Sequence, residues 1–298
     1  MWLRSPVAST GYRLVQLANG VRGIHSLAYG ETMHPAIGPA AEAVALYVTQ
    51  LRLEERIREH AGEFVIWDVG LGAAANALAV LRATRHLACA IRLVSFDDTT
   101  EPLRFALNHA EALGYFGGYE SHAQILLENH GVNFQDAGHC VEWELQPGDF
   151  PAVLARWLAD APAPSADEPH PAPHAILFDP YSPAKNPSMW TLPLFANLFC
   201  LLDPARPCAL ATYSRSTMTR AGLLLAGFYV GAGRATGAKE ETTIASNTLE
   251  LIDQPLDRRW LERARHSHSA EPLREARYRQ APLAPETWEG LQAHPQFR

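Results

Sequence analysis

Short apolar runs that alternate with helix-length stretches are the feature that most constrains the fold of this chain. The strand-like runs cover residues 64–69, 91–96, 141–145, 175–178 and 208–213. Most of these runs consist mainly of apolar residues, which is the pattern of a strand buried on both faces. Because strands separated by helices usually pair in parallel, the sequence predicts an α/β fold with a mostly parallel sheet covered by helices on both sides.

The end of the predicted sheet has a different pattern. A helical stretch at 219–226 is followed by two β-rich runs, 228–231 and 242–252, with no helix-length segment between them. Two such runs favour an antiparallel hairpin. A parallel sheet that ends in a hairpin is typical of Rossmann-like class I methyltransferases, whereas dinucleotide dehydrogenases more often continue with further βα units.

The regular pattern divides the chain into three parts. Residues 61–255 carry the predicted sheet, and we expect them to form one catalytic domain. Residues 1–60 are interrupted by glycine and proline before a helical stretch at 40–59, and we expect a substrate-side segment. Residues 256–298 begin with a basic helix and contain three late prolines, so we expect a loose tail. The proline-rich stretch 161–173 is predicted to be a solvated loop.

Composition and charge narrow the classes of function. The net charge of −7 means that contact with nucleic acid requires a local basic patch. Residues 258–279 carry seven arginines, which form either such a patch or a solvated helix face. The four cysteines lack CxxC spacing, which argues against a zinc knuckle. With no apolar run near the roughly 20 residues that cross a membrane and no signal-peptide pattern, we expect a cytoplasmic monomer without metal or membrane contact.

The segment FVIWDVGLGAAANAL at 64–78 places a strand, a glycine turn and a helix in succession. The helix N-terminus and the unhindered backbone of Gly70 and Gly72 suit a nucleotide-like ligand. The G-x-G-x-x-A pattern fits NAD nearly as well as S-adenosylmethionine. Asp68, at the strand end, is a candidate partner for the ammonium group of S-adenosylmethionine, directly or through water. The alternative is a glycine turn with no ligand.

Acidic residues follow the next two strands. Asp97 and Asp98 end the second strand, and one of them is expected to accept hydrogen bonds from the ribose hydroxyls. Alternatively, both are solvated carboxylates at the start of the next helix. Asp149 follows the third strand, where an adenine amino group needs an acceptor, but it is also placed to cap the following helix.

The stretch AILFDPYSPAKNPSMW is the most informative part of the chain. A buried strand delivers Asp179 to the carboxyl edge of the sheet, followed by Pro180 and Tyr181. This turn resembles the (Asp/Asn)-Pro-Pro-aromatic loop of amino-group methyltransferases, in which acceptors bind the hydrogens of the amine while the ring stacks on a base. Prolines around Lys185 and Asn186 would order the loop before substrate binds. The alternative is that Asp179 only starts a turn.

Several segments resemble one family in order and spacing. They are YGETMHPAIGPAAEA, DVGLGAAANAL, IRLVSFDDTTEPL, VEWELQPGDF, FDPYSPAKNPSMWT and ALATYSRSTMTRAGLLLAGFYV. They are similar to the methyltransferases of the MnmC/MnmD type, and the similarity covers most of residues 15–265. The resemblance implies transfer of a methyl group from S-adenosylmethionine to the amine of 5-aminomethyl-(2-thio)uridine at the wobble position of tRNA, so tRNA is the expected partner.

The resemblance also suggests roles for individual residues. The expected catalytic residues are Asp179 and Tyr181. The expected cofactor-binding residues are Asp68, Gly70, Gly72, Asn76, Asp97 and Asp149. The expected substrate-binding residues are Glu31, His34, Pro180, Lys185 and Asn186.

The chain departs from the family pattern in several places. Pro180 follows the expected catalytic aspartate, where the family usually has a small residue, and the expected ribose acid Asp97 is an aspartate where glutamate is commoner. Ala73 and Ala74 stand where the family's first turn, G-x-G-T-G-x-N, has a threonine and a glycine. A late motif that is rich in lysine and arginine in the family reads GAKEETT here, at 237–243. These departures leave two alternative hypotheses. One is a divergent S-adenosylmethionine-dependent methyltransferase that acts on another amine, and the other is a catalytically silent homologue that binds S-adenosylmethionine.

Overall fold

The structure, a computed structural model, describes residues 11–160, 171–236 and 240–298. Most of the proline-rich stretch 161–173 and the start of the GAKEETT segment lie outside these residues. Within them, none of the helices is both long and apolar enough to cross a membrane.

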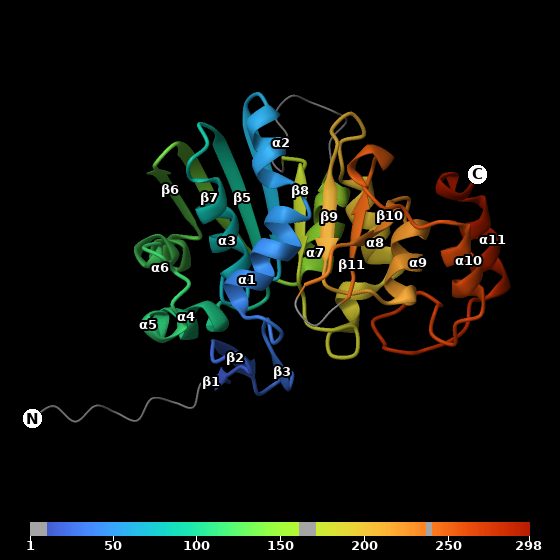
Figure 1. Cartoon of the computed structure of the whole chain (residues 1–298), viewed down its shortest axis with the longest axis horizontal. Coiled ribbons are helices and arrows are strands. Elements are labelled where there is room, and N and C mark those ends of the chain that lie inside the picture. The colour runs from blue at the N-terminus through green and yellow to red at the C-terminus, as the bar shows by residue number, and fades with distance from the viewer. Residues whose placement is uncertain (1–10, 161–170, 237–239) are drawn as a thin grey trace, which may run out of the picture.

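An eight-stranded sheet forms the centre of the molecule (Figure 1), in the order β10-β11-β9-β8-β4-β5-β7-β6. The strands are β4 (Glu63–Val69), β5 (Ala90–Asp97), β6 (Gly131–Asp136), β7 (His139–Pro147), β8 (Ala175–Phe178), β9 (Ala209–Thr212), β10 (Tyr229–Gly233) and β11 (Thr242–Ser246). The five neighbouring strands β9, β8, β4, β5 and β7 pair in parallel. In contrast, β11 is antiparallel to both β9 and β10. The predicted Rossmann-like α/β fold with a terminal antiparallel hairpin is confirmed.

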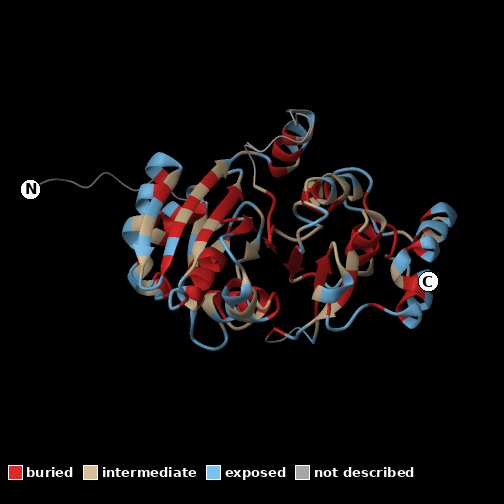
Figure 2. Cartoon of the chain, turned by 90° about the horizontal axis from the view of Figure 1, so that it is seen from above, coloured by how far each residue is buried: buried red, intermediate tan, exposed pale blue. Residues whose placement is uncertain are grey.

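The central parallel strands β4, β8 and β9 are buried on both faces because their side chains alternate between two cores. On β4, Phe64 and Ile66 belong to one core, while Val65, Trp67 and Val69 belong to the other. Figure 2 shows the strands and the helix faces packed on them as buried. This double burial explains why the strands read as continuous apolar runs rather than as alternating ones.

Helices cover the sheet on both faces. The first core is completed by α1 (Pro39–Ala43), the π-helix η1 (Val44–Thr49), α2 (Leu53–Glu59), α3 (Ala75–Thr84), α4 (Glu101–Asn108), α5 (Ala110–Leu113) and α6 (Glu120–Asn129). The second core is completed by α7 (Phe150–Asp160), α8 (Leu192–Cys200), α9 (Thr217–Leu225), α10 (Arg258–Arg265) and α11 (Pro285–Ala293). The helical stretch expected at 40–59 is thus broken into three pieces, and Arg52 between the last two has a left-handed φ of 51°.

Two parts of the structure were not predicted. The N-terminal segment forms a small antiparallel sheet of β1 (Tyr12–Gln16), β2 (Arg22–Ser26) and β3 (Glu31–Thr32), where the sequence suggested irregular structure. The strand β6 pairs with β7 as an antiparallel edge of the main sheet. The second run of the predicted hairpin also ends earlier than expected, because the 3-10 helix η3 (Leu249–Leu251) follows β11.

The C-terminal segment is packed on the second core, so the expectation of a loose tail is wrong. Leu291 and Phe297 are 0% and 3% exposed. The Gln296 side chain accepts a hydrogen bond from the backbone N–H of Val230 (2.8 Å) and donates to the carbonyls of Val230 (2.7 Å) and Leu256 (2.8 Å). The late prolines suggested a loose tail, but two of them lie at the start of helices. The first residues of a helix make no intrahelical bond through their N–H, so proline does not destabilise the helix there. The division of the chain near residues 60 and 255 stays a prediction.

Candidate active site

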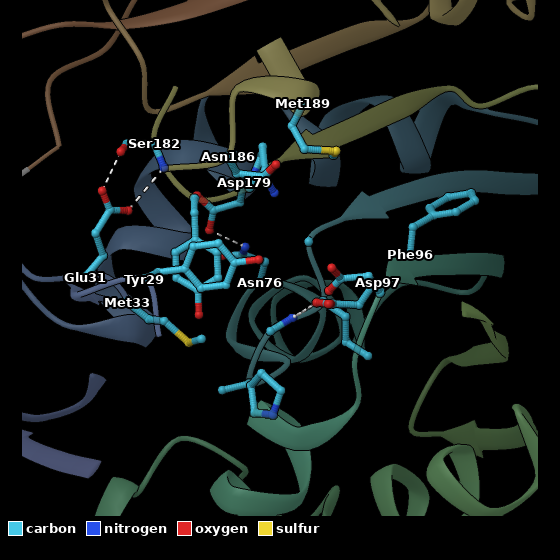
Figure 3. Close-up of a pocket in the computed structure, with 18 of the residues that line it drawn as sticks. Tyr29, Glu31, Met33, Asn76, Phe96, Asp97, Asp179, Ser182, Asn186 and Met189 are labelled. Atoms are coloured by element: carbon cyan, nitrogen blue, oxygen red, sulfur yellow. Dashed lines mark hydrogen bonds between the residues drawn. The ribbon is translucent and has the colours of Figure 1, made fainter. Parts of the chain in front are cut away.

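A cavity of about 430 Å³ lies at the carboxyl ends of β4, β5 and β8 (Figure 3). Its walls come from the glycine turn after β4, the acidic end of β5, the loop after β8 and residues 29–35 of the N-terminal segment. Parallel pairing brings the carboxyl ends of these strands to one edge of the sheet. This edge is where open α/β sheets bind their ligands.

The glycine turn is coupled to the turn that carries Asp179. Gly70 has a φ of 93°, and its N–H donates to the carbonyl of Phe96 at 3.0 Å. A Cβ atom at Gly70 would lie 2.9 Å from the carbonyl oxygen of Asp179. Gly70 therefore allows two protein turns to approach each other, a role that the sequence reading did not foresee.

The residue that precedes the helix after this turn carries backbone strain. Ala74, the N-cap of α3, has a left-handed φ of 61° and is fully buried. A non-glycine residue in this conformation costs roughly 1–2 kcal/mol. The strain falls at the position where the related turn pattern has a glycine.

Asp97 ties the glycine turn to the end of β5. Its Oδ2 accepts the N–H of Gly72 at 2.8 Å, and its Oδ1 accepts the N–H of Thr99 at 3.2 Å. Burial raises the pKa of Asp97 to about 7, the two N–H donors oppose this rise, and the nearby charge of Asp98 adds to it. Asp97 lines the cavity, so its carboxylate is placed to accept hydroxyl groups of a ligand.

Asp149 lines the same cavity and also caps a helix. Its Oδ2 accepts the N–H of Ala152 at 3.2 Å, at the start of α7, while its side chain belongs to the cavity wall. The two roles that the sequence left open are therefore compatible.

Asp68 does not line the cavity, and the expectation of a direct contact with a ligand there is not supported. Its Oδ2 accepts the hydroxyl of Ser95 at 2.9 Å, and that hydroxyl accepts the indole N–H of Trp143 at 2.9 Å. Its Oδ1 has no hydrogen-bond partner among the residues that the structure describes, and burial raises the pKa of Asp68 to about 7. The cause is the alternation along β4, which turns Asp68 toward the same core as Ile66.

Asp179 lines the cavity, where the sequence predicted it. Its N–H donates to the carbonyl of Val69 at 2.9 Å, which fixes the start of the loop. Its Oδ2 accepts the amide Nδ2 of Asn76 at 2.7 Å and lies 3.7 Å from Nε2 of His34. Asn76, which was expected in the cofactor site, lines the same cavity, and its amide also donates to the carboxylate of Asp179 (Figure 3).

The N-terminal segment contacts the loop after β8 through two neighbouring residues. The rings of Tyr29 and Tyr181 are stacked, with centroids 3.9 Å apart and planes at 15°. Glu31 accepts hydrogen bonds from the N–H of Ser182, at 3.1 Å, and from its hydroxyl. Glu31, expected to meet substrate, thus uses both carboxylate oxygens to hold the loop, and Tyr29 and Ser182 are site residues that the sequence reading missed.

The remaining expected substrate residues lie in different places. The Pro180 carbonyl accepts the hydroxyl of Tyr213 at 2.9 Å. Asn186 lines the cavity, and its Oδ1 accepts the hydroxyl of Ser188 at 2.8 Å. Lys185 is exposed and does not line the cavity, so its expected contact with substrate there is not supported.

The charge of the cavity suits a cationic ligand. The carboxylates in its wall belong to Glu31, Glu42, Asp97, Asp98, Asp149 and Asp179. Among the described residues, no lysine or arginine lines it, and no cluster of His, Cys, Asp or Glu could hold a metal ion. These acceptors fit S-adenosylmethionine, which carries a positively charged sulfonium, an ammonium group and ribose hydroxyls that donate hydrogen bonds.

Comparison with known proteins supports the same chemistry. A family model described as S-adenosyl-L-methionine-dependent methyltransferase matches residues 137–248. The bifunctional protein MnmC of tRNA 5-methylaminomethyl-2-thiouridine biosynthesis from Aeromonas hydrophila is 31% identical over 245 residues, covering 75% of this chain and 33% of that protein. Its counterpart from Methylibium petroleiphilum is 30% identical over 249 residues, covering 81% of this chain and 35% of that protein.

The fold has a close match among solved structures. The crystal structure of MnmC2 from Aquifex aeolicus superposes with a TM-score of 0.67 at 21% identity, covering 95% of this chain and 84% of that one. The chain spans about a third of the length of the bifunctional relatives. The chain is therefore similar over most of its length to part of the MnmC proteins, and residues 137–248 match the model of the S-adenosyl-L-methionine-dependent methyltransferases.

Proposed function

We propose that this chain transfers a methyl group from S-adenosylmethionine to the amine of 5-aminomethyl-(2-thio)uridine at the wobble position of tRNA. The observation that carries the proposal is the carboxylate of Asp179, held by Asn76 in an acidic cavity beside the glycine turn. The similarity to MnmC proteins supports the choice of nucleoside. In this proposal residues 61–255 form the methyltransferase domain and residues 1–60 its substrate side.

The cofactor would be held by backbone and carboxylate groups at the ends of β4, β5 and β7. Gly70 and Gly72 leave the turn unobstructed, and Asp97 would accept the ribose hydroxyls. Asp149 would accept the adenine amino group. When bound, S-adenosylmethionine supplies a methyl group on a positively charged sulfur, a carbon that an uncharged amine can attack.

Asp179 would orient the attacking amine and stabilise the positive charge that develops on its nitrogen. A carboxylate aimed at this charge lowers the barrier because the interaction is stronger in the transition state than before it. Correct positioning of both reactants can itself supply on the order of 7–11 kcal/mol. The bonds that fix Asp179, from its own N–H and from Asn76, set that position before substrate binds.

The pH dependence follows from the charge of the cavity. Nearby carboxylates favour the protonated amine, so they raise the pKa of the bound amine. Only the uncharged amine can attack, and its proton must first leave to water. We therefore expect kcat to rise with pH until the bound amine is deprotonated.

Aromatic side chains would position the nucleobase. Tyr29 and Tyr181 already form a stacked pair in the cavity wall, and a ring system of this kind favours a planar base placed against it. His34, 3.7 Å from Asp179, would lie beside the amine.

Methyl transfer to tRNA tests the proposal. Purified protein would be incubated with isotope-labelled S-adenosylmethionine and tRNA that carries the unmethylated aminomethyl nucleoside, and digested nucleosides would be analysed by mass spectrometry. We expect labelled 5-methylaminomethyl-(2-thio)uridine and no label in tRNA that is already methylated. Binding of S-adenosylmethionine in calorimetry without any transfer to this tRNA would reject the proposed substrate.

A further inference from the structure

We propose that Asn76, although it lines the cavity, acts as a positioning residue for Asp179 rather than as a cofactor-binding residue. The inference rests on the proposed function, because Asp179 matters only if its carboxylate meets the amine. The amide nitrogen of Asn76 donates to Oδ2 of Asp179 at 2.7 Å, a short charge-assisted bond between residues 103 positions apart.

The fold brings the two residues together through neighbouring strands. β4 and β8 are parallel neighbours, with Val69 opposite Phe178 in the last register pair. Asn76 lies in the first turn of the helix that follows β4, and Asp179 comes directly after β8. Because Gly70 lets the two turns approach closely, the amide reaches the carboxylate across them.

The surroundings of Asn76 indicate that the functional part of its side chain is the amide N–H donor. Asn76 is 2% exposed, and its Oδ1 is buried without a hydrogen-bond partner in the described part of the chain. An unpaired buried oxygen destabilises the fold, and an apolar residue in the same place would avoid that cost. The bond to Asp179 gives a reason for an amide at this position.

The charge near Asp179 gives the bond a function. Burial raises the pKa of Asp68, and the charge of Asp179 adds to that rise, so these carboxylates repel each other. A donor on Oδ2 counters part of this repulsion and fixes the rotation of the carboxylate. The carboxylate is then oriented before the amine arrives, and little reorganisation is needed in the transition state.

The test compares Asn76→Ala, Asn76→Asp and the exposed control Asn129→Ala. Asn76→Asp keeps the size of the side chain and removes the donor, and thermal melting checks that each variant is folded. We expect kcat on aminomethyl tRNA to fall about 10- to 100-fold in both Asn76 variants. The KM for tRNA and the calorimetric affinity for S-adenosylmethionine should stay within about threefold, because neither ligand loses a direct contact.

A double-mutant cycle separates positioning from a general structural role. When Asp179 is already alanine, the further change Asn76→Ala should lower kcat by less than about threefold, because Asn76 acts through the carboxylate that is missing. The inference would be overturned if the losses of kcat in the two single variants multiplied in the double variant. An unchanged kcat in Asn76→Ala, or loss of S-adenosylmethionine binding in that variant, would also overturn it. If wild-type protein binds S-adenosylmethionine but methylates no tRNA, the proposed function itself fails and this role falls with it.

Discussion

The two walls of the cavity are built in different ways. The sheet wall consists of turns that follow β4, β5 and β8, and strand pairing sets their positions, as with Val69 opposite Phe178. The bond from the Asp179 N–H to the Val69 carbonyl continues that pairing into the loop. The groups proposed to act on the amine therefore lie on the most constrained part of the molecule.

The N-terminal wall depends on side-chain contacts. Tyr29 stacks on Tyr181, and Glu31 binds Ser182, but β3, which carries Glu31, belongs to a separate small sheet. A few substitutions can therefore release this wall and leave the main sheet intact. The comparison predicts that changes in the sheet wall affect the chemical step and that changes in the N-terminal wall affect substrate binding.

The largest effect is expected for Asp179→Ala in the sheet wall. It removes the carboxylate proposed to stabilise the developing ammonium, so kcat should fall about 10²- to 10³-fold. Calorimetry should show nearly unchanged affinity for S-adenosylmethionine, since no predicted cofactor contact is lost. Intact methylation by this variant would show that the carboxylate has no part in the reaction.

Gly70→Ala tests the close approach of the two turns. The new Cβ would lie 2.9 Å from the Asp179 carbonyl oxygen at a left-handed φ of 93°, so we expect about 2–4 kcal/mol of lost stability together with lower kcat. Gly114→Ala is a matched control, with a φ of 71° and no atom within 4 Å of its Cβ. Equal melting temperatures and equal activities in the two variants would mean that the contact with Asp179 is unimportant.

Asp68→Asn tests the buried carboxylate beneath the sheet wall. Its folded-state pKa is raised from 3.8 to about 7, so ionisation opposes folding. The cost is absent below about pH 4, grows between pH 4 and 7, and is complete above pH 7. The amide should raise the free energy of unfolding by about 1–3 kcal/mol at pH 8 and change it little near pH 4. Melting curves across this pH range measure the difference, and an equal shift at both ends would rule out the titration.

Glu31→Ala tests the N-terminal wall. Loss of the two hydrogen bonds to Ser182 should release the segment that carries Tyr29, and kcat/KM for tRNA should fall about tenfold, mainly through KM. The melting temperature should change little, as in the exposed control Glu111→Ala. A fall in kcat as large as that of Asp179→Ala would remove the distinction between the two walls.

The smallest effect is expected for Ala74→Gly. Glycine relieves the left-handed strain of about 1–2 kcal/mol but loses about 0.5–1 kcal/mol through its greater freedom in the unfolded chain. The free energy of unfolding should therefore rise by about 0.5–1 kcal/mol, as measured in urea. A decrease would show that the turn tolerates alanine without strain.

The same contrast explains what the sequence could predict. The buried parallel strands could be predicted from their apolar runs. The positions of Asp179, Gly70 and Asp97 then followed from the ends of those strands. The strands β1 to β3 are short and partly exposed, which leaves no clear period of two. The hydrogen bond between Glu31 and Ser182 joins residues 151 positions apart. A pattern of neighbouring residues in the sequence cannot predict such a contact.

Two other features could not be predicted for local reasons. The direction of Asp68 could not be predicted because both faces of β4 are buried, so alternation did not reveal which core receives the carboxylate. Pro285 and Pro295 suggested a loose tail, although proline is equally suited to the first turn of a helix. The hydrophobic contacts of Leu291 and Phe297 then fix the segment.

A crystal structure with bound S-adenosylmethionine tests the central claim most directly. We predict that the ligand occupies the cavity beside Gly70 and Gly72, with its ribose hydroxyls on Asp97 and its methyl group facing the carboxylate of Asp179. A ligand bound elsewhere, or an Asp179 side chain turned away from the methyl group in that complex, would contradict it.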